Sequence, residues 1–155
     1  MKKTAIFTGA LLALTFTLTG CGGKEPITSI RSFSFSYDTS TMMNAYTRYE
    51  VSYDKKTGTH TATVKPNGVA EADASVYVVD DAFLEKLAAF LHENEVEKWD
   101  GFDKTDSHVM DGNGFHLSVW THEDVTVRAS GYMKWPKNYN EVRDGIARIF
   151  AELGE

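Results

Sequence analysis

Apolar and polar residues alternate along much of this chain, and that period of two is what most limits the fold it can adopt. In residues 32–37, Phe33, Phe35 and Tyr37 fall on one side and serines fall on the other. Alternation of this kind predicts a β-strand with one face against a core and the other face exposed. Similar alternating or β-branched segments predict about six strands, at residues 32–37, 47–53, 59–65, 75–79, 115–121 and 125–129.

A helical period replaces the period of two after residue 79. Asp80 or Asp81 can cap the N-terminus of a helix, because a carboxylate accepts hydrogen bonds from the free backbone N–H groups there. We expect this helix to end at Asn94 in the left-handed conformation, with Val96 folding back onto its last turn. Its apolar face comprises Phe83, Leu84, Leu87, Ala88 and Leu91.

The C-terminal segment carries a second apolar stripe. Asn138 and Glu141 match an N-cap followed by a glutamate three residues later. The stripe comprises Val142, Ile146, Ile149, Phe150 and Leu153. Two such helices can bury their stripes on one face of a mostly antiparallel sheet of about six strands, so the predicted fold class is α+β. Residues 96–114 show no period, and we expect an irregular stretch anchored by Trp99 and Phe102.

Residues 1–20 have the layout of a secretory signal. Lys2 and Lys3 give a positive start, and residues 5–18 form a mostly apolar run without charge. The run is shorter than the ~20 residues needed to span a bilayer comfortably. We therefore expect this segment to be removed as a signal peptide.

The end of this segment, Leu18-Thr19-Gly20-Cys21, resembles the lipobox of bacterial lipoproteins: a branched aliphatic residue, a small residue, Gly or Ala, and then Cys. The resemblance implies cleavage between Gly20 and Cys21 and attachment of a diacylglyceryl group to the Cys21 sulfur. A cysteine thiolate is strongly nucleophilic and suits such alkylation, and two acyl chains give a stable anchor. An ordinary secretory signal with an incidental cysteine is the alternative, although Cys21 is the only cysteine in the chain.

The lipobox divides the chain into a signal peptide at residues 1–20, a lipidated N-terminus and short tether at 21–27, and a single globular domain at 28–155. It implies a protein held at the cell membrane by lipid and facing outside the cytoplasm. Whether the bacterium has one membrane or two is left open, and so is the oligomeric state.

The charge of the mature chain limits its partners. Loss of the signal lowers the number of Lys and Arg residues from 16 to 14, while all 22 acidic residues stay. The formal net charge therefore changes from −6 to −8. Because nucleic-acid binding requires a basic patch, this balance argues against a nucleic-acid partner.

Reactive sites find little support in the sequence, and we assign no catalytic residue, metal ligand or cofactor. The aspartates of residues 100–111 could bind calcium, but their spacing matches no EF-hand loop. His116 and His122 lie on one side of the same predicted strand, roughly 20 Å apart, which is too far for one metal ion. No serine stands in a Gly-x-Ser-x-Gly turn, and the Ser107-His108 and Ser130-Gly131 pairs have no partner that the sequence can place.

Aromatic residues near the second hairpin suggest a binding surface. Trp120 falls opposite Phe115, Leu117 and Val119 in the alternation, so we expect it on the outer face of the sheet. Tyr132 and Trp135 lie just beyond the hairpin, and exposed aromatics among polar groups often mark a site for a sugar or protein partner. The alternative is that Trp120 packs under the long loop or against Trp135.

The mature domain resembles small uncharacterised lipoproteins of gut-type Gram-positive bacteria over residues 96–103 and 130–139. The resemblance implies a location and a fold class, without a reaction. The leading hypothesis is a lipid-anchored, non-catalytic envelope domain that binds a protein or glycan through a sheet face or through the 96–114 stretch. The competing hypothesis is a cell-surface hydrolase. A purely structural or inhibitory lipoprotein is not separable from the first.

Overall fold

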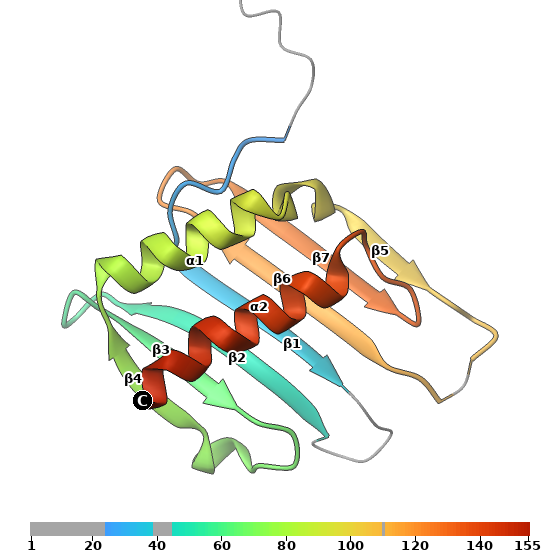
Figure 1. Ribbon diagram of the computed structural model, residues 1–155, viewed down its shortest axis with the longest axis horizontal. Helices are drawn as coiled ribbons and strands as arrows, with labels where there is room; N and C mark the ends of the chain where they lie inside the picture. Colours follow the sequence, from blue (N-terminus) through green and yellow to red (C-terminus); the bar gives the residue numbers. More distant parts are fainter. Residues whose placement is uncertain (1–23, 39–44, 110) are drawn as a thin grey trace, which may run out of the picture.

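A computed structural model describes residues 24–38, 45–109 and 111–155, and these form one α+β domain. Its sheet has seven strands in this part of the chain, in the order β4-β3-β2-β1-β6-β7-β5 (Figure 1). All neighbouring strands are antiparallel except β5 and β7, which are parallel. The strands are β1 Ser32–Asp38, β2 Tyr46–Asp54, β3 Thr59–Lys65, β4 Ser75–Val79, β5 Phe102–Thr105, β6 Gly114–Trp120 and β7 Thr126–Tyr132.

The strand predictions are confirmed at every segment that showed alternation. Phe33 and Phe35 of the central strand β1 are buried, whereas the serines between them stay partly exposed. β1 pairs with β2 on one side and with β6 on the other, so its inward side chains are flanked by those of both strands. The predicted hairpin loop after β2 also forms, with Gly58 at φ +70.

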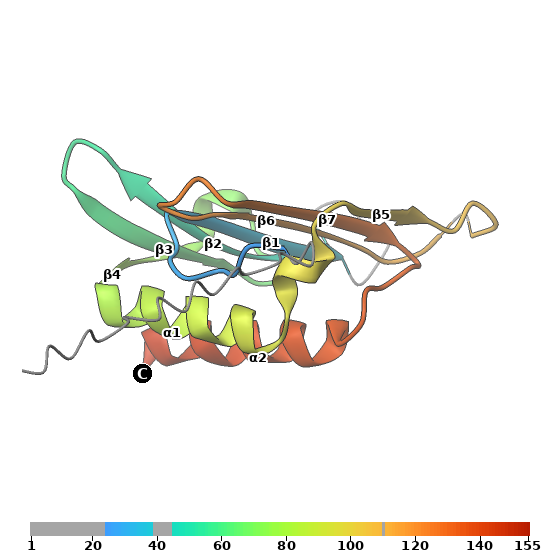
Figure 2. The same cartoon turned by 90° about the horizontal axis from the view of Figure 1, so that it is seen from above.

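Both helices lie on the same face of the sheet, as Figure 2 shows. These are α1 Asp81–Glu93 and α2 Tyr139–Ala151. Their buried positions include Leu87, Leu91 and Ile146, which complete one core together with the inward residues of the strands. In the described chain no layer covers the opposite face of the sheet, called the outer face below.

Two predicted helix ends are wrong, although the helices themselves are confirmed. Asp80 caps α1 as expected, accepting a hydrogen bond from the Phe83 N–H at 3.0 Å. Asn94, however, has φ −93, and Glu95 adopts the left-handed conformation instead. At α2, Asn138 precedes the helix but is itself left-handed and makes no side-chain cap bond. A capping side chain requires an extended backbone at the N-cap, so the predicted capping pair cannot form there.

The expectation of an irregular stretch over residues 96–114 is wrong for residues 96–105, whereas the described residues between β5 and β6 form no helix or strand. It contains the short helix η2, Val96–Trp99, and the edge strand β5. β5 has no buried residue, which is why it shows no apolar alternation. The predicted anchor Trp99 is buried, and its Nε1 donates to the Lys137 carbonyl at 3.1 Å.

The packed domain begins slightly before the predicted boundary at residue 28. Ile27, assigned to the tether, is 1% exposed and belongs to the core, and Lys24 forms an ion pair with Asp100 at 2.7 Å. Gly20, Cys21 and the predicted signal peptide lie outside the described residues. Among the described helices, none is long and apolar enough to cross a membrane.

We predict that Gly131→Ala destabilises the fold. A Cβ at this position in β7 would lie 2.2 Å from the Lys134 carbonyl oxygen and 2.6 Å from the Phe115 ring. Because one of these atoms belongs to the backbone, relief requires a shift of the chain, and we expect a loss of ~1–3 kcal/mol in the free energy of unfolding. Urea denaturation measures this free energy of unfolding. The control Ser118→Ala, on the outer face of β6, should change stability by less than ~0.5 kcal/mol; equal stability of the two variants would contradict the prediction.

Candidate binding surface

The outer face is polar because each strand turns its apolar residues toward the helices. Side chains of a strand alternate between the two faces, and the burial patterns of β1, β6 and β7 place Ser34, Ser118 and Ser130 outward. The register sets these serines on adjacent strands: Ser34 lies opposite Ser118. The result is a hydroxyl-rich surface that can exchange hydrogen bonds with a polar ligand.

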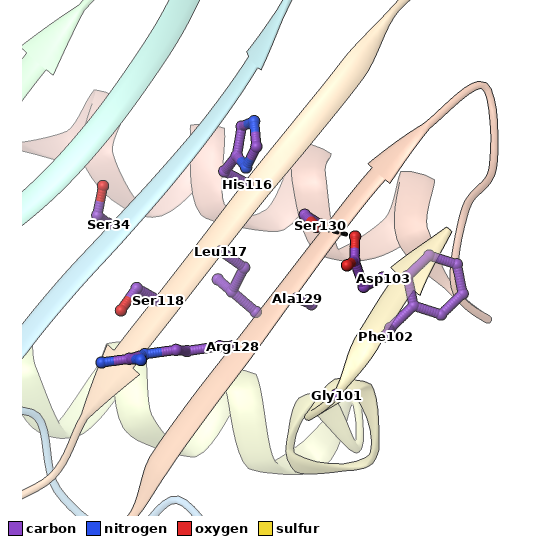
Figure 3. A pocket seen from close by; sticks show the side chains of 10 residues that line it. All are labelled: Ser34, Gly101, Phe102, Asp103, His116, Leu117, Ser118, Arg128, Ala129 and Ser130. Atoms are coloured by element: carbon purple, nitrogen blue, oxygen red, sulfur yellow. Dashed lines mark hydrogen bonds between the residues drawn. The ribbon is translucent and has the colours of Figure 1, made fainter. Parts of the chain in front are cut away.

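A shallow hollow of about 470 Å³ lies on this face over β1, β6, β7 and β5 (Figure 3). His116 and Arg128 line it together with the three serines, and Asp103 of β5 lines its far side. Figure 3 shows the Arg128 side chain extended across β6 toward Ser118. Its volume is within the ~300–1,000 Å³ of small-molecule sites.

The hollow brings together a serine, a histidine and an aspartate that the sequence could not place. Ser130 lies opposite His116 in the β6–β7 register, and its Oγ donates to the Asp103 carboxylate at 2.8 Å. In a catalytic triad the histidine stands between the serine and the acid and takes the proton of the hydroxyl. Here the serine is bonded directly to the acid, an arrangement that does not activate the hydroxyl through His116.

Trp120 lies on the outer face beside this hollow, as predicted. It is 39% exposed, and the guanidinium carbon of Arg128 lies 5.3 Å from its ring centroid. Of the described residues, none provides a carboxylate within ion-pair distance of Arg128, although its backbone N–H donates to Asp100 at 3.0 Å. The surface therefore presents a guanidinium that forms no ion pair within the described residues, next to a large aromatic ring.

The three aromatics proposed from the sequence do not form one surface. Tyr132 is on the outer face but at the far end of β7 from Thr126, the residue opposite Trp120, roughly 20 Å away. Trp135 stacks on Tyr139 of α2, with ring centroids 4.5 Å apart, and so lies on the helix side. The alternative packing of Trp120 against Trp135 is also wrong, since the two lie on opposite sides of the sheet.

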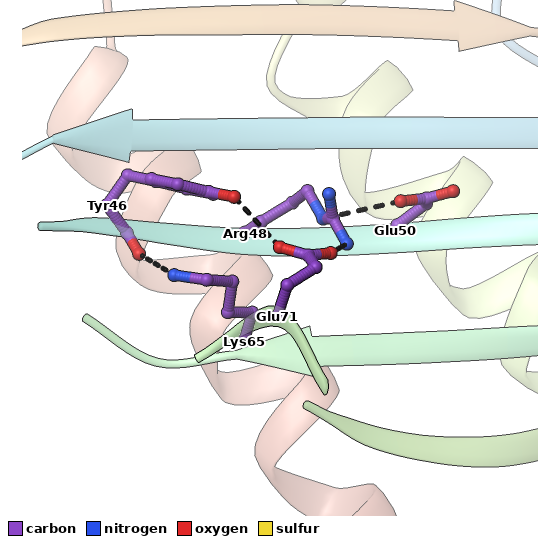
Figure 4. Close-up of polar contacts among 5 residues, drawn as sticks. All are labelled: Tyr46, Arg48, Glu50, Lys65 and Glu71. Carbon is purple, nitrogen blue, oxygen red and sulfur yellow. Dashed lines mark hydrogen bonds and ion pairs between the residues drawn. The ribbon is translucent and has the colours of Figure 1, made fainter. Parts of the chain in front are cut away.

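A cluster of polar side chains covers the outer face near the start of β2 (Figure 4). The short helix η1, Glu71–Asp73, brings the Glu71 carboxylate to the Tyr46 hydroxyl at 2.9 Å and into an ion pair with Arg48. Lys65 is only 1% exposed; its ammonium lies 3.7 Å from the centroid of the Tyr46 ring and donates to the Tyr46 carbonyl at 3.1 Å. These polar groups bond mainly to one another, although the Arg48 Nε is buried without a hydrogen-bond partner.

The acidic and histidine-rich segments do not gather into a metal centre within the described residues, where no group of three or more potential ligands occurs. The aspartates of residues 100–111 bond to separate partners: Asp100 to Lys24, and Asp106 to Lys134 at 3.3 Å. His116 lies on the outer face. His122 lies beyond the end of β6, and its ring centroid is 6.1 Å from that of His60.

Comparison with known proteins adds no family to this geometry. No family model, no curated protein and no solved structure matches the chain.

We predict that Glu71→Gln lowers the stability of the domain at neutral pH. The hydrogen bond from Tyr46 and the Arg48 guanidinium hold the pKa of the Glu71 carboxyl below its usual value, against the smaller opposing effect of burial. A lowered pKa in the folded state stabilises the fold above the ordinary pKa of a glutamate, and this contribution disappears as the pH falls through the folded value.

Urea midpoints at pH 7 and at about pH 3 measure this, since a free glutamate titrates between them. Wild type should exceed Glu71→Gln at pH 7 and lose most of that advantage at the lower pH. Glu85→Gln, an exposed position on α1, serves as control and should match wild type at both. A Glu71→Gln midpoint equal to wild type at pH 7 would show that the cluster adds nothing to stability.

Proposed function

We propose that this protein is a lipid-anchored, extracytoplasmic lipoprotein whose domain binds a partner of the cell envelope on its outer sheet face and catalyses no reaction. The observation that carries the binding function is the hollow on the uncovered face, where Arg128 and the half-exposed Trp120 lie beside three serines of neighbouring strands. The lipobox-like sequence ending in Cys21 supports the anchor.

In this proposal the short tether determines which edge of the domain faces the membrane. Only Gly22 and Gly23 separate Cys21 from Lys24, so the linking chain reaches at most roughly 11 Å. Lys24 is held at the domain surface by Asp100, and Ile27 is buried. With lipid on Cys21, the edge of the domain around Lys24 therefore lies next to the bilayer.

The same edge carries the turn between β6 and β7. Ser29 donates to Glu123 at 2.6 Å and Arg31 pairs with Asp124 at 3.7 Å, which ties the segment before β1 to that turn (Figure 1). The strands run from this edge to the opposite one, so the sheet stands upright on the membrane. Its outer face then points sideways, where an envelope polymer or protein can reach the hollow.

A cell-surface hydrolase is the alternative, and the meeting of Ser130, His116 and Asp103 is the observation that favours it. The hydrogen bond from Ser130 to Asp103 favours a binding role, because no histidine stands between the hydroxyl and the acid as it does in a catalytic triad. Assays with an ester and an amide substrate separate the two. Turnover that Ser130→Ala abolishes would establish the hydrolase.

We predict that Cys21→Ala releases the protein from the membrane. Without the thiol there is no site for the diacylglyceryl group, and the remaining acidic domain has no lipid anchor. Metabolic labelling with a fatty-acid probe and membrane fractionation measure the effect: label should be lost and the protein should become soluble. Lys24→Ala is the control, since it changes the tether and leaves the thiol, and it should keep the label. Membrane association of unlabelled Cys21→Ala would count against lipid as the attachment.

We predict that Trp120→Ala weakens partner binding while the fold stays stable. A half-exposed ring contributes little to the core, but at an interface such aromatics often dominate affinity. Saturable binding of the non-lipidated Cys21→Ala protein to isolated cell envelopes should fall about tenfold, equivalent to ~1.4 kcal/mol. Val76→Ala removes another exposed apolar side chain from the same face, on β4, and should bind like the parent protein. A large drop in the melting temperature of Trp120→Ala would instead assign the ring to the core.

A further inference from the structure

A second hollow, of about 330 Å³, lies on the other side of β5, between η2 and the segment that leads into α2. Three lysines line it, Lys98, Lys104 and Lys137, around the rings of Trp135 and Phe102. Among the described residues, Arg128 is the only Lys or Arg that lines the outer-face hollow. The two sites therefore differ in charge as well as in position.

Trp135 gives this hollow a rigid aromatic wall. Its ring stacks on Tyr139 with centroids 4.5 Å apart and planes inclined by 29°, yet it is 40% exposed. Behind it, Trp99 is buried and donates to the Lys137 carbonyl, which holds the Trp135–Lys137 segment against the domain. A planar apolar surface is thus fixed in place before any ligand arrives.

The hollow has an excess of positive charge in a protein that is acidic as a whole. Lys98 is paired with Glu95, the one acidic residue that lines the hollow. Lys104 and Lys137 have no carboxylate within 4.0 Å among the described residues. The Lys104 ammonium lies 5.3 Å from the Phe102 ring centroid, and the Asn138 side chain, which makes no cap bond, adds an amide to the rim.

We propose that this hollow binds an anionic saccharide. One face of a sugar ring lies against Trp135, its carboxylate or phosphate lies between Lys104 and Lys137, and hydroxyl groups bond to the Asn138 amide. The volume of about 330 Å³ is within the ~300–1,000 Å³ of small-molecule sites. Three lysines around one small hollow are not the extended basic patch that nucleic-acid binding requires. The site is independent of the outer-face hollow.

Isothermal titration of the full chain, in a detergent without sugar groups, tests this with three probes. Trigalacturonate carries carboxylates, glucose 6-phosphate carries a phosphate, and maltotriose is neutral. We expect saturable binding of at least one anionic probe, which also identifies the preferred group, and no saturable binding of maltotriose. Absence of binding by both anionic probes, or equal binding of maltotriose, would overturn the proposal.

Charge-reversed variants localise the binding. The double variant Lys104→Glu/Lys137→Glu should weaken binding of the anionic probe by about tenfold or more. Lys55→Glu/Lys56→Glu makes the same charge change in the β2–β3 loop and should bind like wild type. Lys137→Gln, a milder change, should show a severalfold loss even if the double variant is unstable. Wild-type affinity in Lys137→Gln and in the double variant would overturn the site. Trp120→Ala should not alter these titrations, which separates this site from the outer face.

Discussion

The packing of Phe150 against sheet and helix together is the contact on which this fold depends most. Its ring lies 6.0 Å from Phe33 of β1, 5.1 Å from Tyr49 of β2 and 5.3 Å from Phe83 of α1, measured between centroids. One residue of α2 thereby joins the two central strands to the other helix. Buried aromatic pairs of this kind add to the area they remove from water, so both helices are drawn to one side of the sheet.

One-sided packing explains why the outer face is free for another use. A helix on each face would require apolar residues at every position of the central strands. β1 instead alternates buried Phe33 and Phe35 with partly exposed serines. The same alternation that builds the core therefore supplies the hydroxyl groups of the outer face. It also places Trp120 of β6 and Arg128 of β7 on that face.

The sequence predicted those features that a repeating pattern encodes, and missed those set by single contacts. Alternation and helical stripes predicted six of the seven strands, both helices and the outward side of Trp120 correctly. The left-handed residue was placed at Asn94 instead of Glu95, because the choice depends on how Val96 reaches the core. The hydrogen bond between Ser130 and Asp103 depends on the parallel pairing of β5 with β7, which no local sequence pattern predicts. The position of Trp135 depends on its stacking against Tyr139.

The strand that the sequence missed, β5, is the one that shapes both hollows. It pairs in parallel with β7, setting Asp103 opposite Ser130 and Lys104 opposite Gly131. Since successive side chains of a strand point to opposite faces, Asp103 turns to the outer hollow while Lys104 turns to the lysine-lined one. The partly buried Phe102 of β5 packs against the core, whereas Asp103 and Lys104 are exposed. These two residues are therefore better explained by the two surfaces that β5 separates than by folding.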